Sequence, residues 1–320
     1  MHRTLNVYSS HSLESSEGSA WFSLSFERCT DLSAGALKAM QSFLLFAVMV
    51  SFVSCAPYAI KSSTVSSIDA LFAEYNKPGS PGASFAVIDN GKVVFRKAYG
   101  SADIENKRAA STTTNYRLAS VTKQFTAMAV MMLVDKGRFS LDARLTDVLP
   151  GTPSYMHSVT IRHLMNHTSG IIDYEDLIPD SQTMQVLDKD VLRVLQGIDS
   201  VYFPPGAKFK YSNSGYSLLA LVVEAVSGQP FAQFLKKNIF EPLGMNHTVA
   251  HENGISTVNN RAYGYSRTDS GFVRTDQSVT SAVLGDGGIY SSVDDLFKWD
   301  QALYTESLVH ASLFQEAVTP

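Results

Sequence analysis

The sequence predicts an α+β fold in which a helical layer packs beside antiparallel strands. The stretch ASFAVIDNGKVVFRKAYG, residues 83–100, places two apolar runs around Asn90-Gly91, a pair that accepts the positive φ angles of a tight hairpin turn. Two other stretches, 124–137 and 216–228, are apolar nearly all round, which is typical of helices buried on every side. One hairpin beside two buried helices, with no internal repeat, indicates a mainly helical α+β domain.

The remaining elements follow from local signals. A short helix is predicted before the hairpin from four apolar residues at helical spacing: Ile68, Leu71, Phe72 and Tyr75. The two buried helices are expected to end at Gly137 and Gly228, because glycine adopts the left-handed conformation that terminates a helix. Shorter helices are expected within 140–150, 159–170 and 230–245. A last helix follows the loop GDGG, and Ser292 or Asp294 is expected to cap it.

Composition excludes some classes of function. The 320 residues are 45% hydrophobic and 18% charged, which is ordinary for a globular protein. The formal net charge is −4 and no run of basic residues occurs, so nucleic acid is not an expected partner. The two cysteines, Cys29 and Cys55, both lie near the N-terminus, so the rest of the chain has neither disulfides nor thiolate metal ligands.

The N-terminal region indicates export. Residues 1–39 are Ser-rich and aperiodic, and we expect an unstructured leader or a start codon assigned too early. Residues 40–55 contain an apolar run of about a dozen residues, too short to span a bilayer but typical of a signal peptide. FVSC resembles a lipobox, in which Cys55 would be lipidated and attach the protein to a membrane; cleavage after Ala56 is the alternative. We expect a linker at 56–66 and a place in the bacterial cell envelope.

The segment RLASVTKQFTAMAV places Ser120 three residues before Lys123. Side chains at i and i+3 of a helix share a face, so the hydroxyl and the amine can come within hydrogen-bonding reach. Serine needs a neighbouring base to act as a nucleophile, and lysine serves as that base only where apolar surroundings disfavour its ammonium. Taken alone, S-x-x-K is a weak pattern, and a helix N-terminus with a surface lysine is the favoured explanation of it.

A second polar segment, PPGAKFKYSNSGY, places Tyr211 and Asn213 just before a buried helix. A tyrosine hydroxyl relays protons where cationic groups lie beside it. Asn213 offers both a donor and an acceptor, so it can orient a lysine and a substrate amide together. The structural alternative is an Asx-type turn with a packed tyrosine.

Together these segments resemble the serine β-lactamase and penicillin-binding-protein superfamily. S-x-x-K combined with Y-S-N in place of S-D-N is similar to class C β-lactamases, their carboxylesterase relatives and DD-peptidases. YRLASVTKQFTA, LMNHTSGI, FKYSNSGYSLLA, PLGM and GDGGIYSSVDDLFKW each resemble family segments, in the family's order. The resemblance covers the chain from about residue 66 onwards.

The resemblance implies a β-lactamase-like (DD-peptidase) fold and acyl transfer. In it, Ser120 is the acylated nucleophile, Lys123 and Tyr211 share the general-base work, and Asn213 positions the substrate. The substrate is a small molecule or peptide, with a β-lactam, a D-Ala-D-Ala-type peptide and a short-chain ester as the alternatives. No cofactor and no metal are implied, and the oligomeric state stays open.

Three other motifs bear on alternative classes of site. His163 and His167 are four residues apart, but Leu164 stands where a zinc protease needs glutamate, so we interpret both as structural. The run Asp286-Gly287-Gly288 has no P-loop lysine after it, and we expect a tight turn that brings backbone to the cleft. No G-x-S-x-G occurs, which argues against an α/β-hydrolase.

The sequence departs from the family pattern at its third motif. Neither K-[ST]-G nor H-x-G occurs, and the nearest match, Lys77-Pro78-Gly79, suits a turn better than a strand. We therefore expect a serine hydrolase domain at 67–320 that lacks the family's C-terminal strands and has an incomplete sheet. A catalytically inactive truncated relic, or an envelope binding protein of the same fold, is the alternative to an active enzyme.

Overall fold

The structure is a computed structural model and describes residues 60–319. The chain separates into two compact units, Met1–Pro57 and Tyr58–Pro320, and the described residues all belong to the second. The expected leader at 1–39, the expected signal peptide at 40–55 and its Cys55 lie outside the described residues. The predicted α+β class is confirmed, with helices and small antiparallel sheets in one unit.

The first helix begins earlier than the sequence indicates. Helix α2 (Ser62–Leu71) takes up half of the segment 56–66 that we expected to be a linker, and η1 (Ala73–Asn76) continues it. Within this part of the helix the Ser66 hydroxyl donates to the Ser62 carbonyl one turn earlier at 3.1 Å, so a serine-rich segment is helical here. The Phe72 ring, just after α2, stacks on Tyr99 with centroids 4.6 Å apart.

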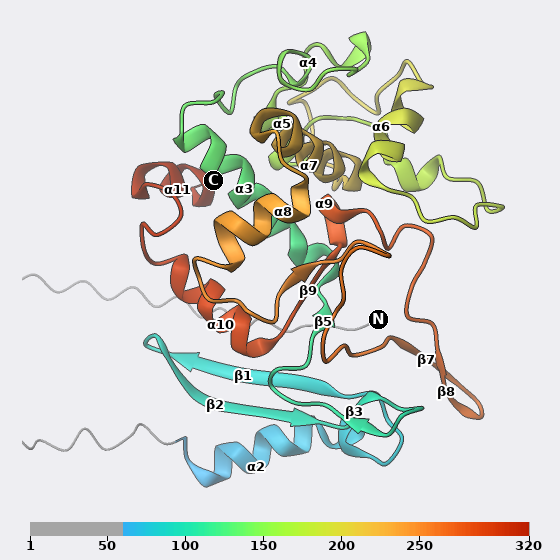
Figure 1. The fold of residues 1–320 in the computed structure, drawn as a ribbon, viewed down its shortest axis with the longest axis vertical. Coiled ribbons are helices and arrows are strands. Elements are labelled where there is room, and N and C mark those ends of the chain that lie inside the picture. The colour runs from blue at the N-terminus through green and yellow to red at the C-terminus, as the bar shows by residue number, and fades with distance from the viewer. Residues whose placement is uncertain (1–59, 320) are drawn as a thin grey trace, which may run out of the picture. The chain divides into compact units, whose positions relative to one another are not determined.

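The predicted hairpin is confirmed. Strand β1 (Ala83–Asp89) pairs antiparallel with β2 (Lys92–Tyr99), and Asn90 and Gly91 between them have φ angles of 49° and 71°. Positive φ at both central residues is the geometry that suits the twist of a two-residue hairpin. A second small pair, β3 (Ser101–Asp103) and β4 (Arg108–Ala109), follows directly. Figure 1 shows α2 along one side of the β1–β2 hairpin and the helical region on the other.

Two apolar helices form the centre of the helical region (Figure 1). Helix α3 (Lys123–Asp135) and helix α7 (Asn213–Ser227) are each buried over most of their length and pack against each other. Gly137 and Gly228, with φ angles of 66° and 69°, end them as predicted. Among residues 60–319 no single helix is long and apolar enough to cross a membrane, although α7 and Phe231–Phe240, bent by 76°, pass that test as a pair.

Shorter helices surround this centre. The predicted helices within 140–150 and 159–170 are single turns, and the one within 230–245 continues as a π-helix. Ser292 caps α10 by accepting from the Asp295 N–H at 3.3 Å, as predicted. The elements are α4 (Leu145–Val148), η3 (Ser154–Met156), α5 (Ile161–Met165), η4 (Tyr174–Asp176), α6 (Asp188–Gln196), α8 (Phe231–Leu235), η5 (Lys236–Phe240), α9 (Leu284–Gly287), α10 (Val293–Ala302) and α11 (Ala311–Val318).

A small three-stranded sheet joins distant parts of the chain, and sequence reasoning did not predict it. Strand β9 (Ile289–Ser291) lies between β5 (Tyr116–Arg117) and β6 (Val249–Ala250), antiparallel to both. The Leu118 N–H continues the β5 ladder by donating to Ile289 O at 2.8 Å. The sheet therefore fixes the chain immediately before Ser120.

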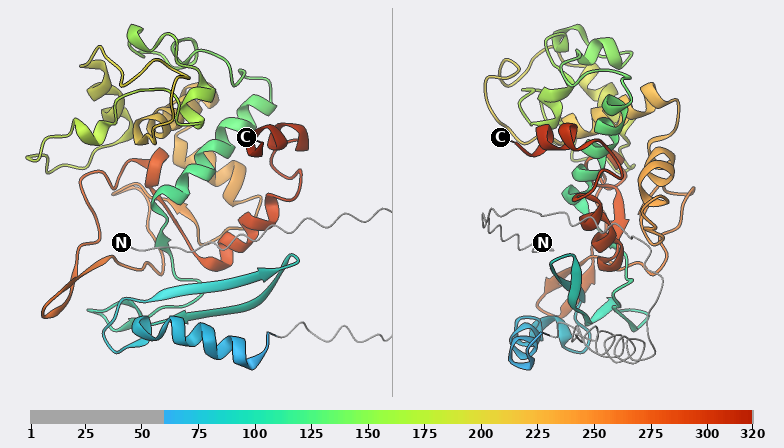
Figure 2. Two further views of the ribbon diagram at one scale, coloured as in Figure 1. Left: turned by 180° about the vertical axis from the view of Figure 1, so that it is seen from behind. Right: turned by 90° about the vertical axis from the view of Figure 1, so that its left-hand side faces the viewer.

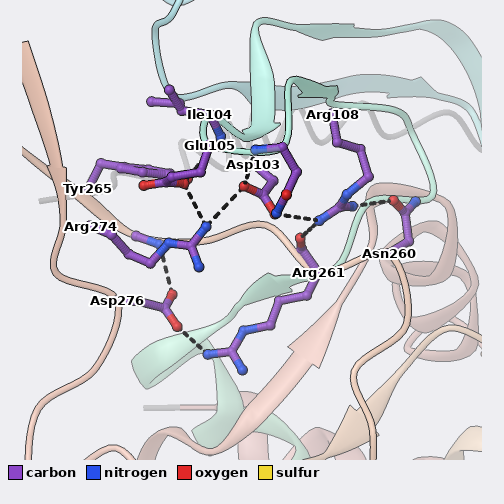
Figure 3. A network of polar contacts seen from close by, with 11 residues as sticks. Asp103, Ile104, Glu105, Arg108, Asn260, Arg261, Tyr265, Arg274 and Asp276 are labelled. Carbon is purple, nitrogen blue, oxygen red and sulfur yellow. Dashed lines mark hydrogen bonds and ion pairs between the residues drawn. The ribbon is translucent and has the colours of Figure 1, made fainter.

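A further hairpin, β7 (Tyr265–Thr268) and β8 (Gly271–Arg274), projects from the body of the unit (Figure 2). Figure 3 shows the polar network at its base. The Arg274 guanidinium binds Asp103 at 2.9 Å and Glu105 at 2.6 Å, and it lies 3.8 Å above the Tyr263 ring. Arg261 pairs with Asp276 in the same network. These ion pairs hold the segment that leads to residues 278–280 against the β3–β4 pair.

Candidate active site

Ser120 stands at the junction between β5 and α3. The turn η2 (Ala119–Thr122) is a 3₁₀ helix, so the regular α-helix begins only at Lys123. Ala119 has a φ angle of 48°, a left-handed conformation that costs a residue with a Cβ about 1–2 kcal/mol. Such strain gathers at functional sites, where the surrounding structure maintains it. The sharp turn leaves Ser120 exposed at the mouth of a pocket.

The structure places Lys123 beside Ser120, as their spacing predicts. The Lys123 side chain is buried, with 6% of the residue exposed. Its Nζ donates to Asn213 Oδ1 at 2.8 Å and to the Asp286 backbone carbonyl at 3.0 Å, and it lies 3.4 Å from Ser120 Oγ. Three oxygens from three separate segments thus surround one amine, and the serine is the most distant of them.

Asn213 reaches this position because α7 begins at that residue. Ser212 caps the helix by accepting from the Gly215 N–H at 3.0 Å, and the Asn213 N–H donates to Asp173 Oδ2 at 2.8 Å. These two bonds fix the backbone of the YSN segment. The side-chain oxygen Oδ1 of Asn213 then points at Lys123. The predicted grouping of Ser120, Lys123 and Asn213 is therefore present in the structure.

Tyr211 joins the group through its ring. The Lys123 Nζ lies 4.8 Å from the Tyr211 ring centroid, within the range of a cation–π contact. The other neighbour of the ring is His167, stacked at 4.6 Å. Tyr211 is 45% exposed, and across residues 60–319 its hydroxyl has no hydrogen-bond partner. The geometry thus brings the tyrosine to the site without bonding its hydroxyl to Ser120 or Lys123.

The two histidines serve the local fold. His163 forms a capping box with Thr160, in which its Nδ1 accepts from the Thr160 N–H at 3.2 Å. His167 Nδ1 accepts from the Ser212 N–H at 3.1 Å. Burial, helped by the nearby Lys123 charge, lowers the pKa of His167 to about 4, so this imidazole is neutral at ordinary pH. Within the described part of the chain, no three His, Cys, Asp or Glu side chains are grouped to hold a metal ion.

The sequence did not predict that Asp286 lines the pocket and contacts Lys123. The GDGG segment forms the single-turn helix α9, which packs against α7 so closely that a Cβ on Gly285 would lie 2.3 Å from the Tyr216 carbonyl oxygen. The expected approach of this backbone to the cleft is real, since the Asp286 carbonyl accepts from Lys123. The Asp286 carboxyl points to another partner and accepts from the Tyr174 hydroxyl at 2.8 Å. Its position after a buried run, next to glycines, was the only signal in the sequence.

The pocket lies in front of these groups and encloses about 330 Å³ of empty space, part of it open to solvent. Tyr174 and Glu175 come from η4, and Ser278 and Thr280 come from the segment before α9. The residues that line it include Arg117, Ser120, Tyr174, Glu175, Asn213 and Asp286. Charged groups of both signs therefore face the space in which a substrate would meet Ser120.

The fold and this arrangement define a class of protein, one that carries an S-x-x-K segment at the start of a helix and a Y-x-N segment facing it. A family model described as Beta-lactamase matches residues 68–319. The chain belongs to this β-lactamase family. The predicted family and its DD-peptidase-like fold are thereby confirmed.

Individual relatives agree with this assignment. The chain is 34% identical to Penicillin-binding protein 4* of Bacillus subtilis over 248 residues, which cover 72% of this chain and 54% of that protein. The solved penicillin-binding protein of Bacillus halodurans is similar with a TM-score of 0.67 and 31% identity, over 79% of this chain and 77% of that one. The D-amino acid amidase of Ochrobactrum anthropi gives a TM-score of 0.69 and 25% identity, over 80% and 74%. The chain spans about half the length of the curated relatives it matches.

Proposed function

We propose that this chain is an exported serine hydrolase of the bacterial cell envelope that acts by acyl transfer through a Ser120 acyl-enzyme. The observation that carries the proposal is the environment of the Lys123 amine. A neutral lysine has two N–H bonds and one lone pair. Asn213 Oδ1 and the Asp286 carbonyl, at 2.8 and 3.0 Å, accept the two N–H bonds. Ser120 Oγ, 3.4 Å from Nζ, is the third group at the amine, so in the neutral form the lone pair is left to accept the serine proton.

The reaction follows from this arrangement. Lys123 takes the Ser120 proton while Oγ bonds to the carbonyl carbon of an amide, a β-lactam or an ester. The bond from that carbon to the leaving nitrogen or oxygen breaks, and the released nitrogen or oxygen takes the proton; an amine or alcohol departs, whereas the nitrogen of an opened β-lactam stays attached to the acyl group. Water then hydrolyses the ester on Ser120 and restores the serine. The 3.4 Å separation suits this step, because catalytic hydrogen bonds are often long without substrate and shorten in the complex.

Tyr211 and α3 have supporting roles in this proposal. Once Lys123 has taken the Ser120 proton, its ammonium beside the Tyr211 ring favours a proton relay in which the tyrosine hydroxyl reaches the leaving group in the filled pocket. The N-terminus of α3 stabilises negative charge that develops on the carbonyl oxygen near Ser120. Export would depend on residues 40–55, with lipidation of Cys55 or cleavage after Ala56 as the two routes.

Covalent labelling tests the proposal. The full chain is incubated with a fluorescent penicillin and, separately, with a fluorophosphonate, and the modified residue is located by peptide mass spectrometry. We expect a single adduct on Ser120, no adduct in Ser120→Ala, and normal labelling of Ser270→Ala, which removes an exposed serine in the β7–β8 turn. A folded wild-type chain without any adduct would refute the proposal. In that case ligand-induced stabilisation without covalent modification would support the envelope binding protein instead.

Comparison of kcat/KM values among candidate substrates then identifies the substrate class. A β-lactam, a D-Ala-D-Ala-type peptide and a short-chain ester are offered as the predicted candidates, together with a D-amino acid amide because one structural relative is a D-amino acid amidase. The substrate with the highest kcat/KM that Ser120→Ala abolishes identifies the class.

A further inference from the structure

Arg117 is a charged side chain that the proposed reaction does not use. It lies three residues before Ser120 on β5, where it pairs with Tyr290 of β9, and it lines the same pocket as Ser120. The hydroxyl of the preceding residue, Tyr116, lies 3.0 Å from Ser84 Oγ on β1 and forms a hydrogen bond with it. Because successive side chains of a strand point to opposite faces, Arg117 points away from the β1–β2 hairpin and toward the pocket.

The Arg117 guanidinium has few partners for its five N–H bonds. Its Nη2 donates to the Ser281 carbonyl at 3.4 Å, which is a long bond. Its Nε is buried and has no hydrogen-bond partner among residues 60–319. Across the same described residues, no carboxylate forms an ion pair with it. A buried donor without a partner costs free energy, so this guanidinium is suited to an acceptor that a ligand supplies.

Close packing holds the guanidinium at this place. A Cβ on Gly287 would lie 3.1 Å from Arg117 Nη2, so the glycine leaves the space that the guanidinium occupies. The neighbouring segment before α9 is fixed as well. Gln185 Nε2 donates to the Ser278 carbonyl at 2.7 Å, and Gln185 Oε1 accepts from the Ala282 N–H at 3.0 Å. The guanidinium therefore lies against a part of the pocket that the fold already holds in position.

Two hydroxyl groups lie on this fixed segment. Ser278 and Thr280 line the pocket together with Arg117, and their hydroxyl oxygens are 3.1 Å apart. A hydroxyl hydrogen turns to suit its acceptor, so either group can donate to an oxygen in the pocket. The planar guanidinium matches both oxygens of a carboxylate, and its hydrogen bonds to an ionised acceptor are strong. Glu175 also lines the pocket, at an exposed position, and its charge favours a ligand with a single negative charge over a phosphate dianion.

We propose that Arg117, with Ser278 and Thr280, forms an anion subsite that binds a carboxylate group of the substrate while Ser120 attacks the substrate carbonyl. The inference rests on the proposed function, since it takes the pocket beside Ser120 as the substrate site. It narrows the substrate class, because a penicillin-type β-lactam and a D-Ala-D-Ala-type peptide carry a free carboxylate, whereas a simple ester or a D-amino acid amide carries none. The carboxylate can belong to the leaving group or to the acyl part, and the experiment distinguishes these two sources.

Binding is measured without catalysis, in the full chain carrying Ser120→Ala, by NMR titration of two probe pairs. N-acetyl-D-alanyl-D-alanine and its C-terminal amide test a carboxylate on the leaving group. N-methylsuccinamic acid and its primary amide test a carboxylate on the acyl part. The members of each pair differ in charge but hardly in shape. In one pair we expect the acid to bind at least about tenfold more tightly than the amide, because hydrogen bonds to a charged group are the strong ones.

Variants assign the preference to Arg117. Arg117→Gln in the same background removes the charge, so the ratio of the two dissociation constants should fall to about one through weaker binding of the acid alone. Arg117→Met serves instead if the glutamine variant does not fold. The matched control is Arg267→Gln, which removes an exposed arginine from β7 and should leave the ratio unchanged. A ratio of about one in both probe pairs with Arg117 intact would overturn the proposal, as would an acid preference that a folded Arg117 variant retains.

Labelling of Ser120 by the fluorophosphonate, measured alongside, separates the two proposals. Normal labelling without an acid preference in either pair refutes the anion subsite and leaves the hydrolase intact. An acid preference that depends on Arg117, in a folded chain whose Ser120 takes no label, refutes the hydrolase and supports the anion subsite as a binding site.

Discussion

Removal of the Phe125 ring is expected to destabilise the helix that carries Lys123. Phe125 is fully buried, and its ring centroid lies 4.2 Å from that of Trp299 and 5.8 Å from that of Phe240. A buried aromatic side chain removes about 150–250 Å² from water, worth about 4–6 kcal/mol at 25 cal/mol per Å². Alanine keeps the Cβ but leaves a cavity, so Phe125→Ala should lower the free energy of unfolding by about 3–5 kcal/mol.

Urea unfolding followed by tryptophan fluorescence measures this loss. The chain has two tryptophans, Trp21 and Trp299, so a Trp21→Phe background leaves a single reporter in contact with the Phe125 ring. The midpoint should fall by about 1–2.5 M urea at an unchanged slope of about 2–3 kcal/mol per M.

The control is Phe272→Ala on β8, because Phe272 is 39% exposed and lies outside the buried core. That variant should change the free energy of unfolding by less than about 1 kcal/mol. A Phe125→Ala variant with the same small change would refute the reasoning, since it would mean that α3 is not packed as the structure has it.

Two further predictions concern the floor of the pocket. Gly285→Ala would place a Cβ 2.3 Å from the Tyr216 carbonyl oxygen, so we expect the free energy of unfolding to fall by more than about 2 kcal/mol and Ser120 to be labelled more slowly. The control is Gly228→Ala, where nothing lies within 4 Å of the added Cβ and the expected loss is about 1 kcal/mol. Thermal unfolding distinguishes the two variants. Burial raises the pKa of Asp286 to about 7 in the folded state, above its unfolded value, so the folded state binds this proton more tightly and the Asp286 contribution to stability rises as pH falls from 8 to 6. That contribution is about 1 kcal/mol, so lowering the pH from 8 to 6 should favour the folded state less in Asp286→Asn than in wild type, as measured by melting temperature. An equal change in the two proteins would contradict the burial of a titrating carboxyl.

Short-range chemistry made several elements predictable. The Asn90-Gly91 turn, the helix ends at Gly137 and Gly228 and the Ser292 cap each depend on one or two residues and their immediate neighbours, and all were confirmed. The 3₁₀ turn at Ser120 was not expected, because its shape comes from the Leu118 N–H bonding to Ile289 rather than from local preference.

The strands of the small three-stranded sheet could not be predicted from the sequence. β5, β6 and β9 are two or three residues long, too short to show an alternating pattern. The β7–β8 hairpin did carry a signal, since SRTDSGFVR places a polar turn with Gly271 between two runs that can pair. That signal was overlooked because most of its side chains are exposed and its core contacts are few.

The sequence by itself determined the family and the group of Ser120, Lys123, Tyr211 and Asn213, because helical spacing and recognisable motifs are properties of neighbouring residues. Only the tertiary structure decided how these side chains meet, with the Lys123 amine held between Asn213 and the Asp286 carbonyl and the Tyr211 ring above it. Asp286 lies 163 positions from Lys123, and no local pattern links them. Their contact arises where α9 packs between α3 and α7, and close packing of that kind is set by the whole core rather than by any one segment.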